Sequence, residues 1–320
     1  MLMLHRNMSR DVRIGKGVCP WRQAGNGIGN PPPHALSRRT PKTPSRPLPT
    51  PPYQIVPITD PEDPRIEPYR DVRERDLVGR DGLFIAEGAV VVRSLVQSAR
   101  HRARSLLIAE KRLAALEPML ASLPADTPVY TVTQPVLDRI AGFPLHRGIL
   151  AVGEKTGVPS VADLLGACGP VARVVMLFGI GNHDNMGGIF RNAAAFGADA
   201  VILDSGCCDP LYRKAIRVSV GATLLVPTAR LAADEDPLAL LDRFGFEAVA
   251  LSPAGAETLA ALTPPRRAAL LFGSEGPGLP PALLARARSV RIPMAGDFDS
   301  LNVATTSGIV LHHIASGQVP

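Results

Sequence analysis

The sequence is poor in several features that would point to a particular class of protein. Aromatic residues make up only 4% of its 320 residues, so any core must be built from aliphatic side chains. Its four cysteines, Cys19, Cys168, Cys207 and Cys208, form no C-x-x-C pair and have no histidine at a zinc-ligand spacing. These absences argue against a disulfide-stabilised secreted domain and a structural zinc site. We interpret the cysteines as reduced thiols of a cytoplasmic protein.

Long apolar runs are also lacking. No stretch reaches the ~18 apolar residues that predict a membrane-spanning helix. The N-terminus has no apolar segment followed by a small-residue cleavage site. We therefore predict no membrane partner and a cytoplasmic location. A transit peptide is an alternative, because the N-terminus is basic and poor in acids.

Acidic residues are almost absent from the first 50 residues, which contain nine Lys/Arg and one acid, Asp11, for a net charge of +8. The remainder holds 26 basic and 28 acidic residues, a net charge of −2. The basic character of the protein therefore belongs to its N-terminus. Residues 1–52 also contain ten prolines and cannot bury enough apolar surface to fold. We predict that residues 1–58 form a disordered, basic, Pro-rich tail, which either contacts RNA phosphates weakly or has no function.

Strands and helices alternate between residues 59 and 155. Apolar runs predict strands at 83–86, 105–109, 129–132 and 149–152, and amphipathic stretches predict helices at 88–100, 110–122 and 134–141. This alternation is typical of a small α/β domain. Residues 156–170 are predicted to form a linker with one short helix.

Residues 171–320 follow the same alternation with longer apolar runs. The continuous run at 171–178 is typical of a strand buried on both faces. Further strands are predicted at 200–203, 223–226, 248–251, 268–272 and 290–292, with helices between them that include 186–197 and 301–315. This pattern predicts a mostly parallel, doubly wound sheet, in which ligands bind beyond the carboxyl ends of the strands.

Three predicted strand ends lead into loops rich in glycine or polar residues, at 179–185, 273–278 and 293–300. The first loop begins like a dinucleotide-binding fingerprint. However, Asp184 occupies the place of the third glycine, where its carboxylate would face the pyrophosphate, so we disfavour NAD or FAD. In the helix that follows, Asn185 either caps the first turn, because its side-chain oxygen can accept a backbone N–H, or belongs to the site itself. Arg191 either is a solvated side chain or directs a rigid guanidinium at a phosphate.

The second loop has three glycines within six residues, more than a turn needs, and glycines let a backbone approach a ligand closely. Glu275 within it is either a helix-cap partner or an acceptor for a polar ligand. In the third loop, Ser300 and Asn302 can cap the last helix. A flat heterocycle held by backbone groups and apolar side chains would fit Ile292, Met294 and Leu301.

These segments, in this order and spacing, resemble the SpoU/TrmH family of RNA 2′-O-ribose methyltransferases, in the SPOUT class. Asn185-x-Gly-x-Ile-x-Arg191 is similar to the first motif of that family, and Leu271-Phe-Gly-Ser-Glu-Gly-Pro-Gly-Leu279 to the second. Ile292-Pro-Met294 with Ser300-Leu-Asn-Val303 is similar to the third motif. Upstream, 84–88 and 146–151 resemble, less specifically, the ribosomal-protein-like substrate-binding domain of the family. Residues 1–60 lie outside the resemblance.

The resemblance implies a fold, a partner and a cofactor. It implies a deep trefoil knot in a SpoU methyltransferase domain at 171–320, a smaller α/β RNA substrate-binding domain at 59–155, and a homodimer. The cofactor would be S-adenosylmethionine and the substrate a ribose 2′-hydroxyl of tRNA or rRNA. The implied catalytic residues are Arg191, Asn185, Glu275, Ser300 and Asn302. The implied cofactor-binding residues are Gly273, Glu275, Gly276, Ile292, Met294 and Leu301, and no metal is implied.

By position, Arg191 is the catalytic arginine of the family. A guanidinium stays protonated, so we expect it to clamp a phosphate and stabilise charge near the hydroxyl, not to act as a free base. The sequence departs from the family pattern at Asn192, where Thr or Ser is more frequent, and at His183, where Pro or Arg is common. Three alternatives stay open: an inactive RNA-binding relative, a small-molecule α/β enzyme, and a base methyltransferase of the same class.

Overall fold

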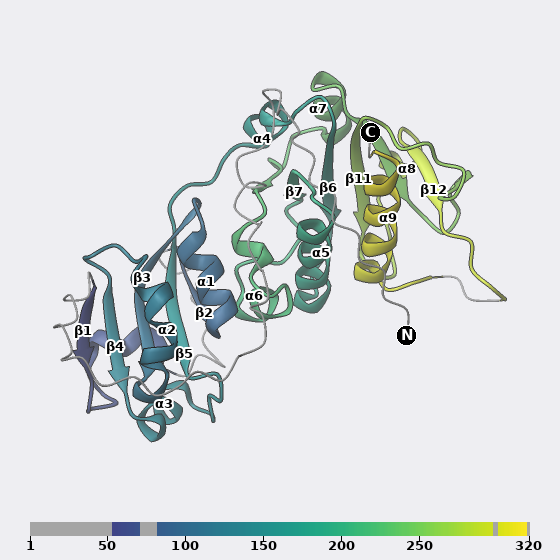
Figure 1. The fold of residues 1–320 in the computed structure, drawn as a ribbon. Coiled ribbons are helices and arrows are strands. Elements are labelled where there is room, and N and C mark those ends of the chain that lie inside the picture. The colour runs from purple at the N-terminus through teal and green to yellow at the C-terminus, as the bar shows by residue number, and fades with distance from the viewer. Residues whose placement is uncertain (1–52, 71–81, 297–299, 319–320) are drawn as a thin grey trace, which may run out of the picture.

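The computed structural model describes residues 53–70, 82–296 and 300–318. These residues form two α/β units, each built on one sheet (Figure 1). The predicted tail up to residue 52 lies outside the described residues. None of the helices in the described ranges has both the length and the apolar character needed to span a bilayer.

The first unit is a mixed five-stranded sheet in the order β1-β4-β3-β5-β2, with helices on both faces. Neighbouring strands are parallel from β1 to β3, whereas β5 is antiparallel to both β3 and β2. The strands are β1 (Gln54–Pro57), β2 (Leu83–Glu87), β3 (His101–Ala109), β4 (Pro128–Val132) and β5 (Ile149–Lys155). The helices are η2 (Pro64–Tyr69), α1 (Ala89–Gln97), η3 (Glu110–Arg112), α2 (Leu113–Leu120) and α3 (Gln134–Ala141).

Strand β1 corrects the predicted boundary of the tail at residue 58. Gln54–Pro57 pairs with β4, and the flanking Tyr53 and Ile58 are buried. The strand is short and has no amphipathic alternation of its own, with two exposed residues followed by a half-buried one. Its pairing depends on a partner more than 70 residues away in the chain. Its local sequence therefore does not reveal it.

The second unit is a seven-stranded parallel sheet in the order β10-β12-β9-β11-β6-β7-β8. This confirms the predicted mostly parallel sheet. The strands are β6 (Ala172–Phe178), β7 (Ala200–Leu203), β8 (Thr228–Arg230), β9 (Glu247–Leu251), β10 (Glu257–Thr258), β11 (Arg267–Gly273) and β12 (Arg288–Arg291). The helices are α4 (Val161–Ala167), α5 (His183–Ala195), α6 (Arg213–Val218), η4 (Ala222–Leu224), α7 (Pro237–Arg243), α8 (Pro281–Leu284) and α9 (Val303–Gly317).

The central strand β6 explains the continuous apolar run in the sequence. Val175 and Leu177 pack under α5 and α9, whereas Val174 and Met176 pack against α4 and α7 on the opposite face. Helix α4 lies within the predicted linker, 156–170, yet it packs into the core of the second unit. Helix α5 lies between α6 and α9 (Figure 1).

The predicted strand at 223–226 is wrong. Gly221 has φ +84°, and the N–H of Leu224 donates to the Gly221 carbonyl at 3.0 Å, which begins the 3-10 helix η4 instead. Leu224 is buried by contact with the first unit, since it belongs to the same hydrophobic cluster as Val91 and Leu95 of α1, whereas Val226 packs in the core of the second unit. Burial between units and burial in a sheet leave the same apolar pattern in the sequence.

The two units share a core and a set of polar contacts. Leu211, Ile216 and Leu224 of the second unit complete the hydrophobic cluster under α1 and α2. Arg213 donates to Glu87 of β2 at 2.6 Å, and both side chains are largely buried. The segment that links the first and second loop motifs is therefore the surface that holds the first unit.

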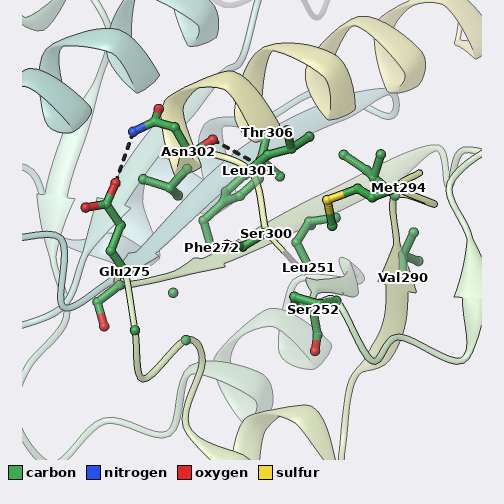
Figure 2. A pocket seen from close by; sticks show the side chains of 17 residues that line it. Leu251, Ser252, Phe272, Glu275, Val290, Met294, Ser300, Leu301, Asn302 and Thr306 are labelled. Carbon is green, nitrogen blue, oxygen red and sulfur yellow. Dashed lines mark hydrogen bonds between the residues drawn. The ribbon is translucent and has the colours of Figure 1, made fainter. Parts of the chain in front are cut away.

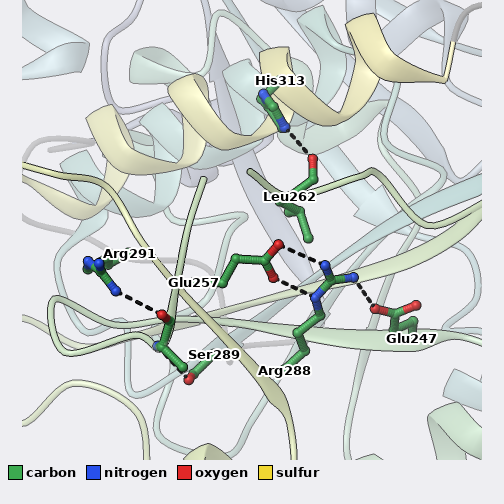
Figure 3. A network of polar contacts seen from close by, with 8 residues as sticks. Glu247, Glu257, Leu262, Arg288, Ser289, Arg291 and His313 are labelled. Atoms are coloured by element: carbon green, nitrogen blue, oxygen red, sulfur yellow. Dashed lines mark hydrogen bonds and ion pairs between the residues drawn. The ribbon is translucent and has the colours of Figure 1, made fainter. Parts of the chain in front are cut away.

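Strands β9, β10 and β12 are joined at their amino ends by an ion network (Figure 3). Arg288 donates to both carboxylate oxygens of Glu257 at 2.8 and 2.9 Å, and to Glu247 at 2.9 Å. These hydrogen bonds raise the pKa of Arg288 above its usual value. The network fastens the edge of the sheet whose carboxyl ends carry the candidate site.

Candidate functional site

A cavity of about 490 Å³ opens at the carboxyl ends of the neighbouring strands β9, β11 and β12, beside the start of α9 (Figure 2). Its size is that of an ordinary small-molecule site. The second and third predicted loops both contribute to its wall. All six residues implied for cofactor binding line it: Gly273, Glu275, Gly276, Ile292, Met294 and Leu301.

The loop after β11 needs its glycines to fold back on itself. A Cβ on Gly273 would lie 2.1 Å from the carbonyl carbon of Gly278, so no side chain fits there. Gly276 and Gly278 have φ values of +87° and +71°, which L side chains rarely adopt. The glycines thus allow the loop to close upon its own backbone, while its residues form one wall of the cavity.

Much of the remaining lining is apolar. It includes Leu251, Phe272, Met294 and Leu301, which Figure 2 labels, and Ile292. Leu301 is 40% exposed, unusual for a leucine and consistent with a side chain that a ligand would cover. Ser252, Ser300 and Thr306 also line the cavity. An apolar wall with a few polar groups suits a flat heterocycle bearing hydroxyls.

Three side chains from three different segments form a closed polar ring beside the cavity. Asn185 of α5 donates to Glu275 Oε1 at 2.8 Å. Asn302 donates to Asn185 Oδ1 at 2.8 Å and to Glu275 Oε1 at 3.0 Å. The Oδ1 atom of Asn302 also accepts from the N–H groups of Ala304 and Thr305, so it caps α9. The ring therefore ties all three loop motifs together.

Of the two readings of Asn185, the helix cap is wrong. Helix α5 begins at His183, three residues before the expected start at 186, and Asn182 Oδ1 accepts from the N–H groups of Asp184 and Asn185. Asn185 lies inside the helix, where it is 7% exposed and its amide is consumed by the ring. The segment Asn182-His-Asp-Asn185 contains two asparagines that could cap the helix, and the tertiary contacts select the first.

Arg191 lies outside the cavity. It is exposed on α5, about 9 Å along the helix axis from Asn185. Within the part of the chain that the structure describes, its guanidinium has no hydrogen bond or ion pair. The structure thus gathers Asn185, Glu275 and Asn302 and lines the cavity with Ser300, but it does not bring Arg191 among them.

Strand β9 also contributes to the cavity, which the sequence did not predict. Ser252 and Pro253 line the cavity directly after this strand. Their loop has no cluster of glycines or amides that would indicate a binding site. The only signal is the strand order, because β9 lies between β11 and β12, and this order is a property of the sheet.

The cysteines near the site are not candidates for nucleophilic chemistry. Burial raises the pKa of Cys207 to about 12 and that of Cys208 to about 11, so both thiols stay protonated at neutral pH. Cys168, Cys207 and Cys208 are free thiols, as predicted for these three. Over the described ranges, His, Cys, Asp and Glu side chains nowhere gather in threes as a metal ion would need.

The chain is similar in sequence to known proteins. The model of the SpoU rRNA methylase family matches residues 172–312. An uncharacterized tRNA/rRNA methyltransferase of Mycobacterium bovis is 42% identical over 277 residues, which are 81% of this chain and 94% of that protein.

Solved structures are similar over the same extent. The AdoMet-bound rRNA methyltransferase from Sinorhizobium meliloti has a TM-score of 0.69 and 23% identity, and the match covers 83% of this chain and 100% of that one. A structure described as an RNA 2′-O ribose methyltransferase has a TM-score of 0.65 and 25% identity, over 82% of this chain and 99% of that one. With motif loops, fold and relatives in agreement, the chain belongs to the SpoU rRNA methylase family.

Proposed function

We propose that this protein is an S-adenosylmethionine-dependent methyltransferase that methylates a ribose 2′-hydroxyl of tRNA or rRNA. The observation that carries the proposal is the cavity at three neighbouring strand ends, with the Asn185–Glu275–Asn302 ring at its edge. The relative named as a tRNA/rRNA methyltransferase supports the substrate class, and the RNA 2′-O ribose methyltransferase supports the position of methylation.

The cavity fits the proposed cofactor. The apolar wall of Leu251, Ile292, Met294 and Leu301 would hold the adenine ring, and the glycine loop would hold the rest of the molecule by backbone groups. S-adenosylmethionine supplies a methyl group on a positively charged sulfur. Glu275 has one oxygen in the ring and offers the other to a polar or cationic group at the cavity edge. The AdoMet-bound relative supports this assignment.

The protein residues would act mainly by positioning. A ribose hydroxyl is a weak nucleophile and must lose its proton as it attacks. Arg191 stays protonated, so it would hold an RNA phosphate and stabilise negative charge near that hydroxyl. The ring of Asn185, Glu275 and Asn302 would keep the two halves of the site in a fixed geometry, which is a large part of what such an enzyme supplies.

The family resemblance leads us to propose three further properties: a knot within 171–320, a homodimer, and a cytoplasmic location. The position of Arg191 supports the dimer, because an exposed guanidinium outside its own cavity is available to a site formed with a second chain.

The test is the Arg191→Ala variant. We expect methyl transfer to fall at least about 100-fold, because a donor that stabilises developing charge is worth about that much. S-adenosylmethionine binding, measured by calorimetry, should change less than about twofold, since Arg191 does not line the cavity. Methyl transfer is measured on RNA from a strain that lacks the enzyme, followed by mass spectrometry of the nucleosides.

Each alternative has its own outcome in this test. Arg266→Ala is the control, because Arg266 is exposed at the amino end of β11, on the edge of the sheet opposite the cavity. Loss of both activity and cofactor binding in Arg191→Ala would make Arg191 a structural residue. A wild-type protein that binds no cofactor would be an inactive RNA-binding relative, and a methylated base in the product would overturn the 2′-O assignment.

A further inference from the structure

A stacked ring pair lies between the candidate site and the first unit. The rings of His183 and Tyr212 are 4.0 Å apart between centroids and inclined by 30°. His183 is the first residue of α5 and Tyr212 is the N-cap of α6. Both are half-buried, and neither belongs to a hydrophobic core cluster. A stacked pair that the core does not use is a surface on which another flat ring can lie.

A series of contacts leads from this pair to the first unit. Tyr212 precedes Arg213, whose guanidinium donates to Glu87 at 2.6 Å. Gly88 follows, and the side chain of Arg147 lies across it, since a Cβ there would be 2.8 Å from Arg147 Cδ. In the same way, Arg112 lies across Gly148, the next residue after Arg147, with its Cγ 2.9 Å from the Cβ position. Both glycines have positive φ.

In the other direction the ring pair adjoins the site. Asn185, two residues after His183, donates to Glu275 at the edge of the cavity. A path defined by Arg112, Arg147, the His183–Tyr212 pair and the cavity edge therefore crosses the junction of the two units. We call these four side chains the junction track.

The arginines of the junction track lack countercharges. Arg112 and Arg147 are exposed, and neither forms a hydrogen bond or ion pair with any described residue. Some exposed arginines elsewhere are paired, as Arg102 is with Asp126 at 2.5 Å and Arg286 with Asp236 at 2.9 Å, whereas others, such as Arg191, are not. Two unpaired arginines whose side chains cross Gly88 and Gly148 favour an anionic partner, and a guanidinium matches the geometry of a phosphate.

We propose that a single-stranded stretch of RNA runs along the junction track, with one base stacked on the His183–Tyr212 pair and phosphates held by Arg112 and Arg147. The proposal deepens the proposed function, on which it rests. Stacking requires an unpaired base, because bases within a duplex have no free face. Cations that follow the backbone together with a ring that stacks a base are the usual elements of single-strand recognition.

The test uses two fluorescein-labelled 12-nucleotide RNAs, an oligouridylate and an abasic strand of the same length, with fluorescence anisotropy as the readout. Replacing Tyr212 by alanine should weaken oligouridylate binding about 5- to 100-fold, the range expected for one lost base stack. The affinity of the Tyr212→Ala variant for the abasic strand should equal that of the wild type. Tyr212→Phe keeps the ring and should recover the lost affinity. His183→Ala should follow Tyr212→Ala.

The Arg147→Gln variant tests the phosphate contact. Both RNAs should bind more weakly, and the slope of log Kd against log salt should decrease by about 0.7, the value for one phosphate on a single strand. The matched control is Arg266→Gln, an exposed arginine far from the track, which should keep the wild-type slope. Thermal melting of each variant shows that it is folded.

Three results would overturn the proposal: a wild type that does not bind oligouridylate, a Tyr212→Ala variant that loses affinity equally for both RNAs, or an Arg147→Gln slope equal to that of the control. These measurements do not need methyl transfer. RNA binding along the junction track can therefore be disproved for a protein that is an active methyltransferase. Equally, the proposed methyltransferase function can be disproved while RNA binding along the track is confirmed.

Discussion

At the scale of single residues, the site depends on amides whose role is set by a partner distant in the sequence. Asn185 and Asn302 are 117 positions apart and hydrogen-bond directly, and Glu275 joins them. Sequence motifs identified all three residues. The sequence did not reveal that Asn185 is buried, because a helix cap and a ring member require the same side chain.

We expect the Asn185→Asp variant to lose the ring. The substitution removes the donor to Glu275 and places a second carboxylate beside it, which should cost about 1–3 kcal/mol of unfolding free energy. Cofactor affinity, measured by calorimetry, should fall more than about tenfold because the loop after β11 is released.

Asn182→Asp on the same helix is the matched control, since aspartate caps a helix as well as asparagine does. If Asn185→Asp bound the cofactor as tightly as this control, the ring would not be what holds the loop.

At the scale of elements, α5 owes its close contacts to two small residues. A Cβ on Gly188 would lie 2.7 Å from Ala304 of α9, and one on Gly187 would lie 2.8 Å from the carbonyl oxygen of Ala215 in α6. The sequence predicted this helix. It did not predict which two helices flank it, because the glycines only permit close approach.

Gly187→Ala should lower the free energy of unfolding by up to about 2 kcal/mol. The clash with α6 costs about 1–3 kcal/mol, and alanine gains roughly 1 kcal/mol over glycine in a helix, which offsets part of that cost. Chemical denaturation measures the loss. Gly181→Ala is the control, as no atom lies within 4 Å of its Cβ position. A Gly187→Ala variant more stable than this control would mean that α6 moves aside at no cost in free energy.

At the scale of the whole molecule, the junction between the units is a continuous, partly polar interface. Ser98 donates to the Leu224 carbonyl at 2.8 Å, and Arg100 donates to the carbonyls of Val226 and Thr228, each at 2.9 Å. His101 lies beside them, against a smaller cavity that residues of both units line. We therefore expect the units to unfold together.

The junction should make stability depend on pH through His101. Burial, with Arg100 and Lys155 nearby, lowers the pKa of His101 from 6.5 to about 4. Between these values the unfolded chain binds a proton that the folded chain does not. Stability contributed by the neutral imidazole is therefore complete above pH 6.5 and is lost as pH falls toward 4, by at most about 3 kcal/mol.

Unfolding by denaturant at several pH values, compared with His101→Phe, isolates this contribution, because both proteins share all other titratable groups. Phenylalanine keeps an aromatic ring against Phe84, which the His101 ring contacts edge-on at 5.2 Å. If the free energies of unfolding of the two proteins changed in parallel between pH 4 and 6.5, protonation of His101 would not destabilise the folded protein.

The sequence by itself determined most of the elements, with β1 and η4 as exceptions, and the residue types of the loops. Strands buried on both faces, such as β6, require continuous apolar runs, and closely folded loops such as that after β11 require glycine, so both leave local traces. Only the tertiary structure decided which strand ends meet, which asparagine caps α5, and that the segment around Leu224 is covered by the first unit. The physical reason is that burial and hydrogen bonding are satisfied by whichever partner is near in space, and the local sequence does not record which partner that is.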